Sequence, residues 1–193
     1  MQWFRDLRIR TKLLASFGAV LVLLGLLGVF AASRLAVVNA QSRIIAENWL
    51  PATEVSSAMA AVAANVRIAQ YRHVASTSAD AMADAQRAVV QRTGVLDSLD
   101  RVYEGLVVVP EERVLLQRFR EQWSAYMEEW PAIEALSRGD RGDAAGARLR
   151  DAMPRFEAAT TTLGRLVALN HDGGMAASAR AATVYRTARW VLG

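Results

Sequence analysis

Two arginines and a tyrosine in the first half of the chain have the side chains best suited to bind a small anion. Arg67, Tyr71 and Arg72 lie within two helical turns of one another. A planar guanidinium group can hold a carboxylate through two parallel hydrogen bonds, so a pair of them predicts a site for an organic or amino acid carboxylate. The competing interpretation is that these arginines are solvated surface residues, because charged side chains usually face water.

A second group of candidate ligand-binding residues lies further along the chain and comprises Tyr126, Trp130 and Arg148. Aromatic rings beside guanidinium groups can wall a pocket for an organic acid. Tyr126 and Trp130 also follow an apolar stripe at helical spacing, which favours a place in the core. Both interpretations stay open for these residues.

Other kinds of chemistry lack the residues that they need. The chain has two histidines, His73 and His171, and neither has an acidic residue four positions on. Cysteine is absent, so a closed zinc site with four ligands cannot be assembled. The sequence also has no P-loop, glycine-rich nucleotide loop or Ser-His-Asp pattern. It therefore predicts no enzyme, no metal site and no cofactor.

These candidate residues follow a long apolar segment near the N-terminus. The stretch 13–32 contains no charged residue, and a helix of that length spans about 30 Å, the thickness of the hydrocarbon core of a bilayer. A cleaved signal peptide is the alternative, but its apolar region is typically shorter. The basic residues that precede the stretch predict that segment 1–12 is cytoplasmic and that the rest of the chain is exported.

The basic excess of the chain is confined to this N-terminal part. The formal net charge is +4, and residues 1–34 alone carry that balance, through Arg5, Arg8, Arg10, Lys12 and Arg34 against Asp6. From Leu35 onward the basic and acidic residues cancel. No basic surface is left over for a nucleic acid.

The exported part is predicted to be all-α, because it is rich in Ala, Leu, Arg and Glu and shows no strand-like alternation. Polar or β-branched breaks separate four helical segments, at about 35–75, 80–106, 110–138 and 143–189. Pro51 should bend the first segment and Pro154 should kink the fourth. Short breaks join antiparallel neighbours, so the sequence predicts an up-down-up-down four-helix bundle over residues 33–189.

The last residues of the sequence have a different character. Trp190, Val191, Leu192 and Gly193 form an aromatic and apolar run, as at the interface end of a membrane span. Segment 190–193 is therefore predicted to begin a second transmembrane helix.

Four short motifs, taken in order, resemble a known family. They are the segments at 8–14 (RIRTKLL), 48–51 (NWLP), 110–113 (PEER) and 185–190 (YRTARW). The chain resembles, over nearly its whole length, the four-helix-bundle sensory domain of bacterial methyl-accepting chemotaxis proteins. The resemblance implies a homodimeric receptor in the bacterial inner membrane. Its periplasmic bundle would detect a small chemoeffector and pass a displacement of the last helix to cytoplasmic signalling proteins, through a part of the receptor beyond this sequence.

The resemblance also bears on the paired arginines. In the aspartate-sensing branch of these receptors, two ligand-contacting arginines of the first helix are five residues apart, the interval between Arg67 and Arg72. A third arginine of that set has no counterpart, because Ser76 stands at its position. The resemblance thus implies an anionic ligand but not aspartate in particular.

Two other functions remain open from the sequence. The same kind of bundle is found as the input domain of membrane-bound histidine kinases and diguanylate cyclases, and only sequence downstream of Gly193 separates these from a chemoreceptor. A bundle without a small ligand, which docks a protein partner such as a periplasmic binding protein, is the third possibility. A dry core would favour it.

Overall fold

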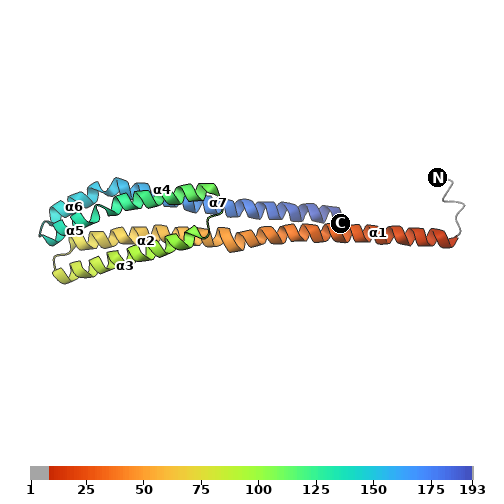
Figure 1. Ribbon diagram of the computed structural model, residues 1–193, viewed down its shortest axis with the longest axis horizontal. Helices are drawn as coiled ribbons and strands as arrows, with labels where there is room; N and C mark the ends of the chain where they lie inside the picture. The colour runs from red at the N-terminus through yellow and green to blue at the C-terminus, as the bar shows by residue number, and fades with distance from the viewer. Residues whose placement is uncertain (1–8, 193) are drawn as a thin grey trace. The chain divides into compact units, whose positions relative to one another are not determined.

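The structure of the chain is a computed structural model that describes residues 9–192. Most of the predicted cytoplasmic segment 1–12, and Gly193 at the end of the predicted second span, lie outside the described residues. The chain divides into two compact units, the first formed by both ends of the chain and the second by Ile45–Met175. The elements in chain order are α1 (Ile9–Ile44), η1 (Ile45–Trp49), α2 (Leu50–Ala75), α3 (Ala79–Glu104), α4 (Pro110–Met127), α5 (Trp130–Arg138), α6 (Gly142–Asp151) and α7 (Met153–Leu192) (Figure 1).

The first unit contains α1, in which the predicted span forms uninterrupted helix. The hydroxyl of Ser16 donates to the carbonyl oxygen of Lys12 at 2.9 Å, so the one polar side chain of the stretch 13–32 is satisfied by its own helix. By length and composition, α1 contains a segment able to cross a membrane, with a mean hydropathy of 2.6 and none of it buried within the protein. This agrees with the predicted transmembrane helix.

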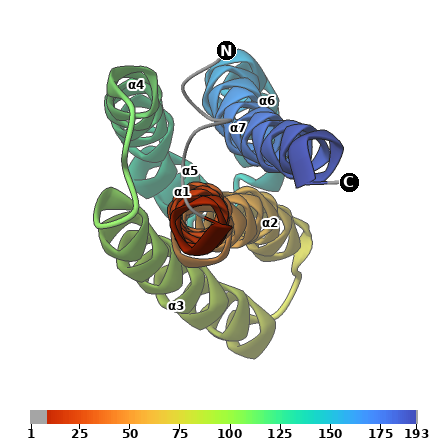
Figure 2. The same ribbon diagram turned by 90° about the vertical axis from the view of Figure 1, so that its right-hand side faces the viewer.

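The second unit is an antiparallel bundle of four arms. Helices α2 and α3 are the first two arms, α4 and α5 together form the third, and α6 with the first part of α7 forms the fourth (Figure 2). The predicted all-α four-helix bundle is therefore confirmed.

Contacts at the two ends of this unit fix the up-down-up-down order. At one end, a methyl group placed on Gly146 would lie 3.8 Å from Val74 Cγ1, which brings the start of α6 beside the end of α2. At the other end, the side-chain amide of Asn48 donates to the carbonyl oxygen of Leu106 at 2.7 Å. The α3–α4 loop therefore lies beside η1.

Local sequence explains where most helices begin. Ser78 caps α3 by accepting a hydrogen bond from the backbone N–H of Ala81 at 3.3 Å. Pro110 is the first residue of α4, where its missing N–H costs nothing. Pro51, Pro131 and Pro154 are likewise in the first turn of α2, α5 and α7.

The third predicted helix is not continuous as expected. It is interrupted at Glu128 and Glu129, because Pro131 cannot donate a hydrogen bond to the carbonyl of Met127. The kink expected at Pro154 appears as the break at Ala152 between α6 and α7. Next to Pro51, the helix widens into the single π-helical turn η1, which accommodates the missing backbone donor.

Small side chains let α2 lie close to its neighbours in the core. Ala52, Ala63 and Ala69 are fully buried along one face of α2. Met59 is the largest buried apolar side chain of α2, and most of the other large core side chains come from the other arms: Leu96, Tyr103, Phe119, Tyr126, Ile133, Leu149 and Leu163.

The indole ring of Trp49 lies directly on Gly173 of α7. A Cβ atom at position 173 would be only 2.3 Å from the ring, and one at Gly174 would be 3.5 Å from Trp49 Cβ. This close approach requires glycine at position 173. The Gly173–Gly174 pair lies within α7 without a break.

Candidate functional site

The side chain of Arg67 is buried in the bundle, with 5% of its surface exposed. It projects from α2 toward the third and fourth arms. Its Nη1 donates to the hydroxyl of Tyr126 at 3.0 Å, and its Nη2 donates to the hydroxyl of Tyr71 and to the carbonyl oxygen of Leu149, each at 3.2 Å. Arg67 therefore connects α2 with α4 and α6.

Aromatic rings surround the Arg67 guanidinium. Its central carbon is 5.1 Å from the ring centre of Tyr71, 5.6 Å from that of Tyr126 and 4.8 Å from that of Phe156. Rings stabilise a cation through their negative faces. Every hydrogen-bond acceptor of Arg67 is neutral, and no carboxylate among the described residues pairs with it. The charge is solvated by the protein but not neutralised.

Tyr126 forms the inner wall of this arrangement and is 1% exposed. Its hydroxyl accepts from Arg67 and donates to the side-chain oxygen of Gln70. Burial raises the pKa of Tyr126, and the nearby charge of Arg67 opposes the shift only in part. The phenol thus stays protonated at neutral pH and cannot serve as the missing counter-ion.

Tyr71 is the outermost member of the group, with 43% of its surface exposed. Since it both hydrogen-bonds Arg67 and covers it with its ring, it is the one side chain whose rotation would open Arg67 to solvent. We call Arg67, Tyr71, Tyr126 and Phe156 the Arg67 cluster.

The structure does not bring Arg72 together with Arg67. Residues five apart in an α-helix point about 140° away from each other. Arg72 is exposed, and its side chain has no hydrogen bond or ion pair with any described residue. The predicted pair of converging guanidinium groups is therefore not formed within one chain.

Arg148 lies just outside the Arg67 cluster, because it precedes Leu149, whose carbonyl Arg67 contacts. It is exposed and binds Glu129, with Nη2 3.0 Å from Oε2. Arg155, which precedes Phe156, binds the other oxygen of the same carboxylate at 2.8 Å. Two arginines thus share one carboxylate at the surface near the cluster.

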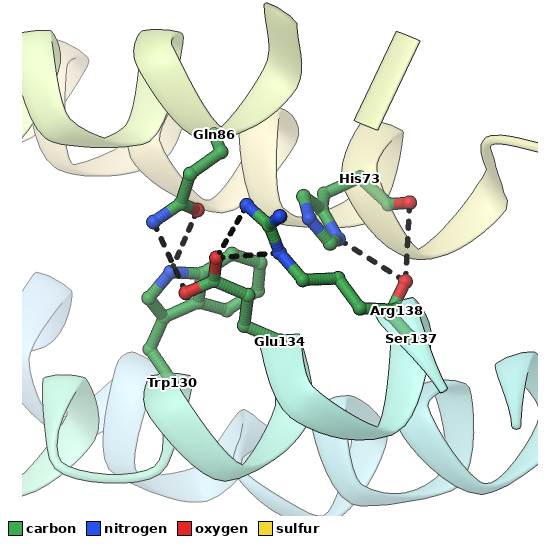
Figure 3. Close-up of polar contacts among 6 residues, drawn as sticks. All are labelled: His73, Gln86, Trp130, Glu134, Ser137 and Arg138. Carbon is green, nitrogen blue, oxygen red and sulfur yellow. Dashed lines mark hydrogen bonds and ion pairs between the residues drawn. The ribbon is translucent and has the colours of Figure 1, made fainter. Parts of the chain in front are cut away.

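Trp130 belongs to a different cluster, on the α5 side of the bundle (Figure 3). Its Nε1 donates to Oε1 of Gln86 at 3.2 Å, and its ring meets the ring of His73 edge-on at 5.4 Å. Gln86 also donates to Glu134 at 3.1 Å, and Glu134 binds Arg138 at 2.9 Å. Trp130 is 5% exposed, as its place on the apolar stripe predicts.

His73 is fully buried within this second cluster. Its Nδ1 is 3.1 Å from the hydroxyl of Ser137, which in turn donates to the His73 carbonyl, while Nε2 has no partner among the described residues. Burial lowers the pKa of His73; the charge of Glu134 opposes this and that of Arg138 reinforces it. His73 is therefore neutral at pH 7.

Sequence analysis did not identify a third buried polar group, formed by Tyr103, Glu112 and Asn170. The Tyr103 hydroxyl donates to Glu112 Oε1 at 3.1 Å and accepts from Asn170 Nδ2 at 2.6 Å. The backbone N–H groups of Val108 and Val109 donate to Glu112 Oε2 at 2.7 and 2.9 Å. The one signal in the sequence is an acidic residue at the third position after a helix start, a typical capping position.

No group of three or more His, Cys, Asp or Glu side chains is placed to hold a metal ion within residues 9–192.

Comparison with known proteins agrees with this architecture. The sequence matches the family described as a four helix bundle sensory module for signal transduction, over residues 6–185. A search of curated proteins finds none that matches the chain. The chain thus belongs to the four-helix-bundle sensory modules of chemotaxis receptors.

Proposed function

We propose that the chain is the sensory part of a transmembrane chemoreceptor and binds a small anionic chemoeffector, an organic or amino acid carboxylate, at the Arg67 cluster. One observation carries the proposal: a guanidinium group that is 5% exposed and has only neutral acceptors. A buried charge without a counter-ion is costly, and an anion that reaches it forms a charge-assisted hydrogen bond in a poorly solvated place.

The surroundings of Arg67 indicate how a carboxylate would be held. The ligand would enter where the half-exposed Tyr71 ring turns outward, and would replace the Tyr71 hydroxyl at Arg67 Nη2. The protonated Tyr126 hydroxyl is a second donor at the same place. Arg148 and Arg155, which share only one carboxylate, add positive charge near the entrance. Arg72 and Trp130 lie outside this arrangement.

The same contacts couple binding to the fourth arm. Arg67 holds the carbonyl of Leu149 in α6 and lies against the ring of Phe156 in α7. A ligand that draws Arg67 toward itself would weaken the bond to Leu149 and favour a second position of α7. Since α7 runs without a break from Met153 to Leu192, it can carry such a displacement along its length.

The membrane context of the proposal rests on charge and on the family. The basic residues before the apolar stretch favour a cytoplasmic N-terminus and a periplasmic bundle in the bacterial inner membrane. We also propose a homodimer, the form implied by the resemblance to chemotaxis receptors. The response would then reach cytoplasmic signalling proteins through a part of the receptor beyond this sequence.

Calorimetric titration of the full chain in lipid nanodiscs with acetate, malate, aspartate and benzoate tests the proposal. We expect saturable binding of at least one of these anions, and a loss of at least tenfold in affinity in Arg67→Met. Arg72→Met is the matched control, because Arg72 is exposed and has no partner among the described residues. No binding of any carboxylate, or equal binding by Arg67→Met, would contradict the proposed site.

A second function is favoured by the closed packing of the Arg67 cluster. Arg67 and Tyr126 are only 5% and 1% exposed, so a small ligand has little access to them. The second candidate function is therefore a bundle that binds no small ligand and docks a protein partner. A full chain that binds no carboxylate but still folds and dimerises would support this alternative.

A further inference from the structure

A cavity of about 340 Å³ lies between α3 and α4. Residues of the Arg67 cluster do not line it. The lining residues that matter for its chemistry are Thr93, Asp97, Asp100, Phe119, Arg120 and Trp123. Its volume is at the lower end of the range for small-molecule sites.

Two aromatic rings of α4 form the floor of this cavity. Phe119 and Trp123 lie one helical turn apart, with ring centres 6.1 Å apart and planes at 26°. They are 2% and 8% exposed, so both are core residues and only a small part of their surface, mainly that of Trp123, borders the cavity. Aromatic faces attract cations, and the indole of tryptophan does so most strongly.

The charges at the rim leave one carboxylate without a counter-ion. Arg120 binds Asp100 with Nε 3.0 and 2.9 Å from its two oxygens, and also binds Glu104 at 2.9 Å. Asp97, one turn before Arg101 on α3, forms no ion pair with any described residue. The cavity therefore carries an unpaired negative charge beside an aromatic floor.

The hydroxyl of Thr93 adds an unused polar group. Its Oγ1 is buried and has no hydrogen-bond partner among the described residues. In the same unit the hydroxyls of Thr53, Thr160 and Thr162 all donate to the carbonyl four residues before them, the usual arrangement in a helix. Thr93 does not do so; other atoms of the residue line the cavity, and its Oγ1 is covered.

We propose that this α3–α4 cavity binds a small organic ammonium ion. The cationic group would lie beside the exposed part of Trp123 and face Asp97, and an N–H or O–H group of the ligand would donate to Thr93 Oγ1 once the Thr93 side chain rotates toward the cavity. An anion is disfavoured because the carboxylates of Asp97 and Asp100 line the cavity. The site is distinct from the Arg67 cluster in place and in the sign of its charge, so the chain would accept two ligands of opposite charge.

The test uses the full chain in lipid nanodiscs, titrated with choline and with 2-phenylethylammonium by calorimetry. The control ligand is 3,3-dimethyl-1-butanol, which has the shape of choline without its charge. We expect saturable binding of at least one of the two cations, and binding of the uncharged alcohol at least tenfold weaker than that of choline if choline is the cation bound.

Variants locate the site. Asp97→Asn should weaken binding of the cation about tenfold, and Thr93→Val should weaken it less. Asp151→Asn is the matched control, because Asp151 is an exposed aspartate without an ion pair among the described residues. Arg67→Met should leave cation binding unchanged, which separates this site from the carboxylate site.

Three results would overturn the proposal. They are the absence of saturable binding by either cation, binding of the uncharged alcohol as tight as that of choline where choline binds, and unchanged binding of the cation by Asp97→Asn. Because Asp97 is exposed, its substitution leaves the core intact, and circular dichroism of each variant verifies that the bundle is folded.

Discussion

Two buried charges in the bundle, Glu112 and Arg67, are treated in opposite ways by their surroundings. Glu112 is completely buried and accepts three hydrogen bonds, from the Tyr103 hydroxyl and from the backbone N–H groups of Val108 and Val109. Arg67 is nearly as buried but donates only to two phenols and one carbonyl. The carboxylate is held mainly by backbone groups, whereas two of the three partners of the guanidinium are side chains, of which Tyr71 is half-exposed.

This difference separates a structural charge from a functional one. Two of the three donors to Glu112 are backbone groups at the start of α4, so the charge caps that helix and closes the α3–α4 loop. No ligand could take the place of these donors without unfolding the loop. Arg67 could exchange Tyr71 for a carboxylate while its remaining contacts stay in place.

The largest loss in the free energy of unfolding is expected for Glu112→Met, the same replacement as in Arg67→Met. Glu112→Met leaves one buried hydroxyl and two backbone N–H groups without an acceptor, which should lower the free energy of unfolding by about 3 kcal/mol. Urea denaturation followed by circular dichroism measures it. Glu111→Met is the control, since Glu111 is an exposed neighbour in the same helical turn. Equal losses in the two variants would show that Glu112 does not hold the loop.

A smaller loss is expected for Tyr103→Phe. The Tyr103 hydroxyl joins Glu112 to Asn170 of α7, and burial raises its pKa, so it donates at any physiological pH. Its removal leaves one oxygen of Glu112 without its donor and should lower the free energy of unfolding by about 1–2 kcal/mol. Urea denaturation again gives the value. Tyr71→Phe, at a half-exposed tyrosine, should cost less, and the reverse order would refute this role of Tyr103.

For Arg67→Met we expect a change in the free energy of unfolding within about 1 kcal/mol of zero. Methionine fills most of the same space, and an apolar replacement removes the desolvation cost of a charge without a counter-ion. The measurement is the same denaturation series. A loss as large as that of Glu112→Met would mean that Arg67 is structural, and the contrast between the two charges would be lost.

The smallest effect concerns the dependence of stability on pH, through a third buried titratable group, His73, which lies in the cluster around Trp130. Because burial lowers its folded-state pKa, the unfolded chain binds the proton more readily. The stabilisation is complete above the ordinary pKa of histidine, about 6.5, and is lost as the pH falls through the lower folded-state value. Thermal unfolding between pH 7.5 and 5 should show this loss in the wild type and in His171→Gln, an exposed control, but not in His73→Gln.

Local signals in the sequence predicted the helices and their ends well. The predicted segments that begin at 80 and 110 match the starts of α3 and α4, and Tyr126 and Trp130 of the predicted apolar stripe are buried. The exception is the break at Glu128 and Glu129, because the predicted helix over 110–138 continues through Pro131. A proline in the first turn of a new helix looks the same in sequence as one inside a longer helix.

The candidate site was predicted only in part, because it depends on how the arms are rotated. Arg67, Tyr71 and Tyr126 contact one another, while Arg72 points away from them and Trp130 contacts His73. Spacing along one helix fixes which residues share its face. It does not fix which residues of another arm lie opposite, and so neither the Tyr103–Glu112–Asn170 group nor the α3–α4 cavity could be predicted.

The contact of Trp49 with Gly173 sets a limit on how far one helix can travel past another. The ring lies on Gly173, and Trp49 Cβ lies beside Gly174. The residues that precede Gly173 on the same face of α7 are Leu169 and Asn170, one helical turn or about 5 Å away. A lengthwise shift of α7 by one turn would place one of these side chains where not even a Cβ atom fits, so the contact limits the shift in that direction to less than one turn.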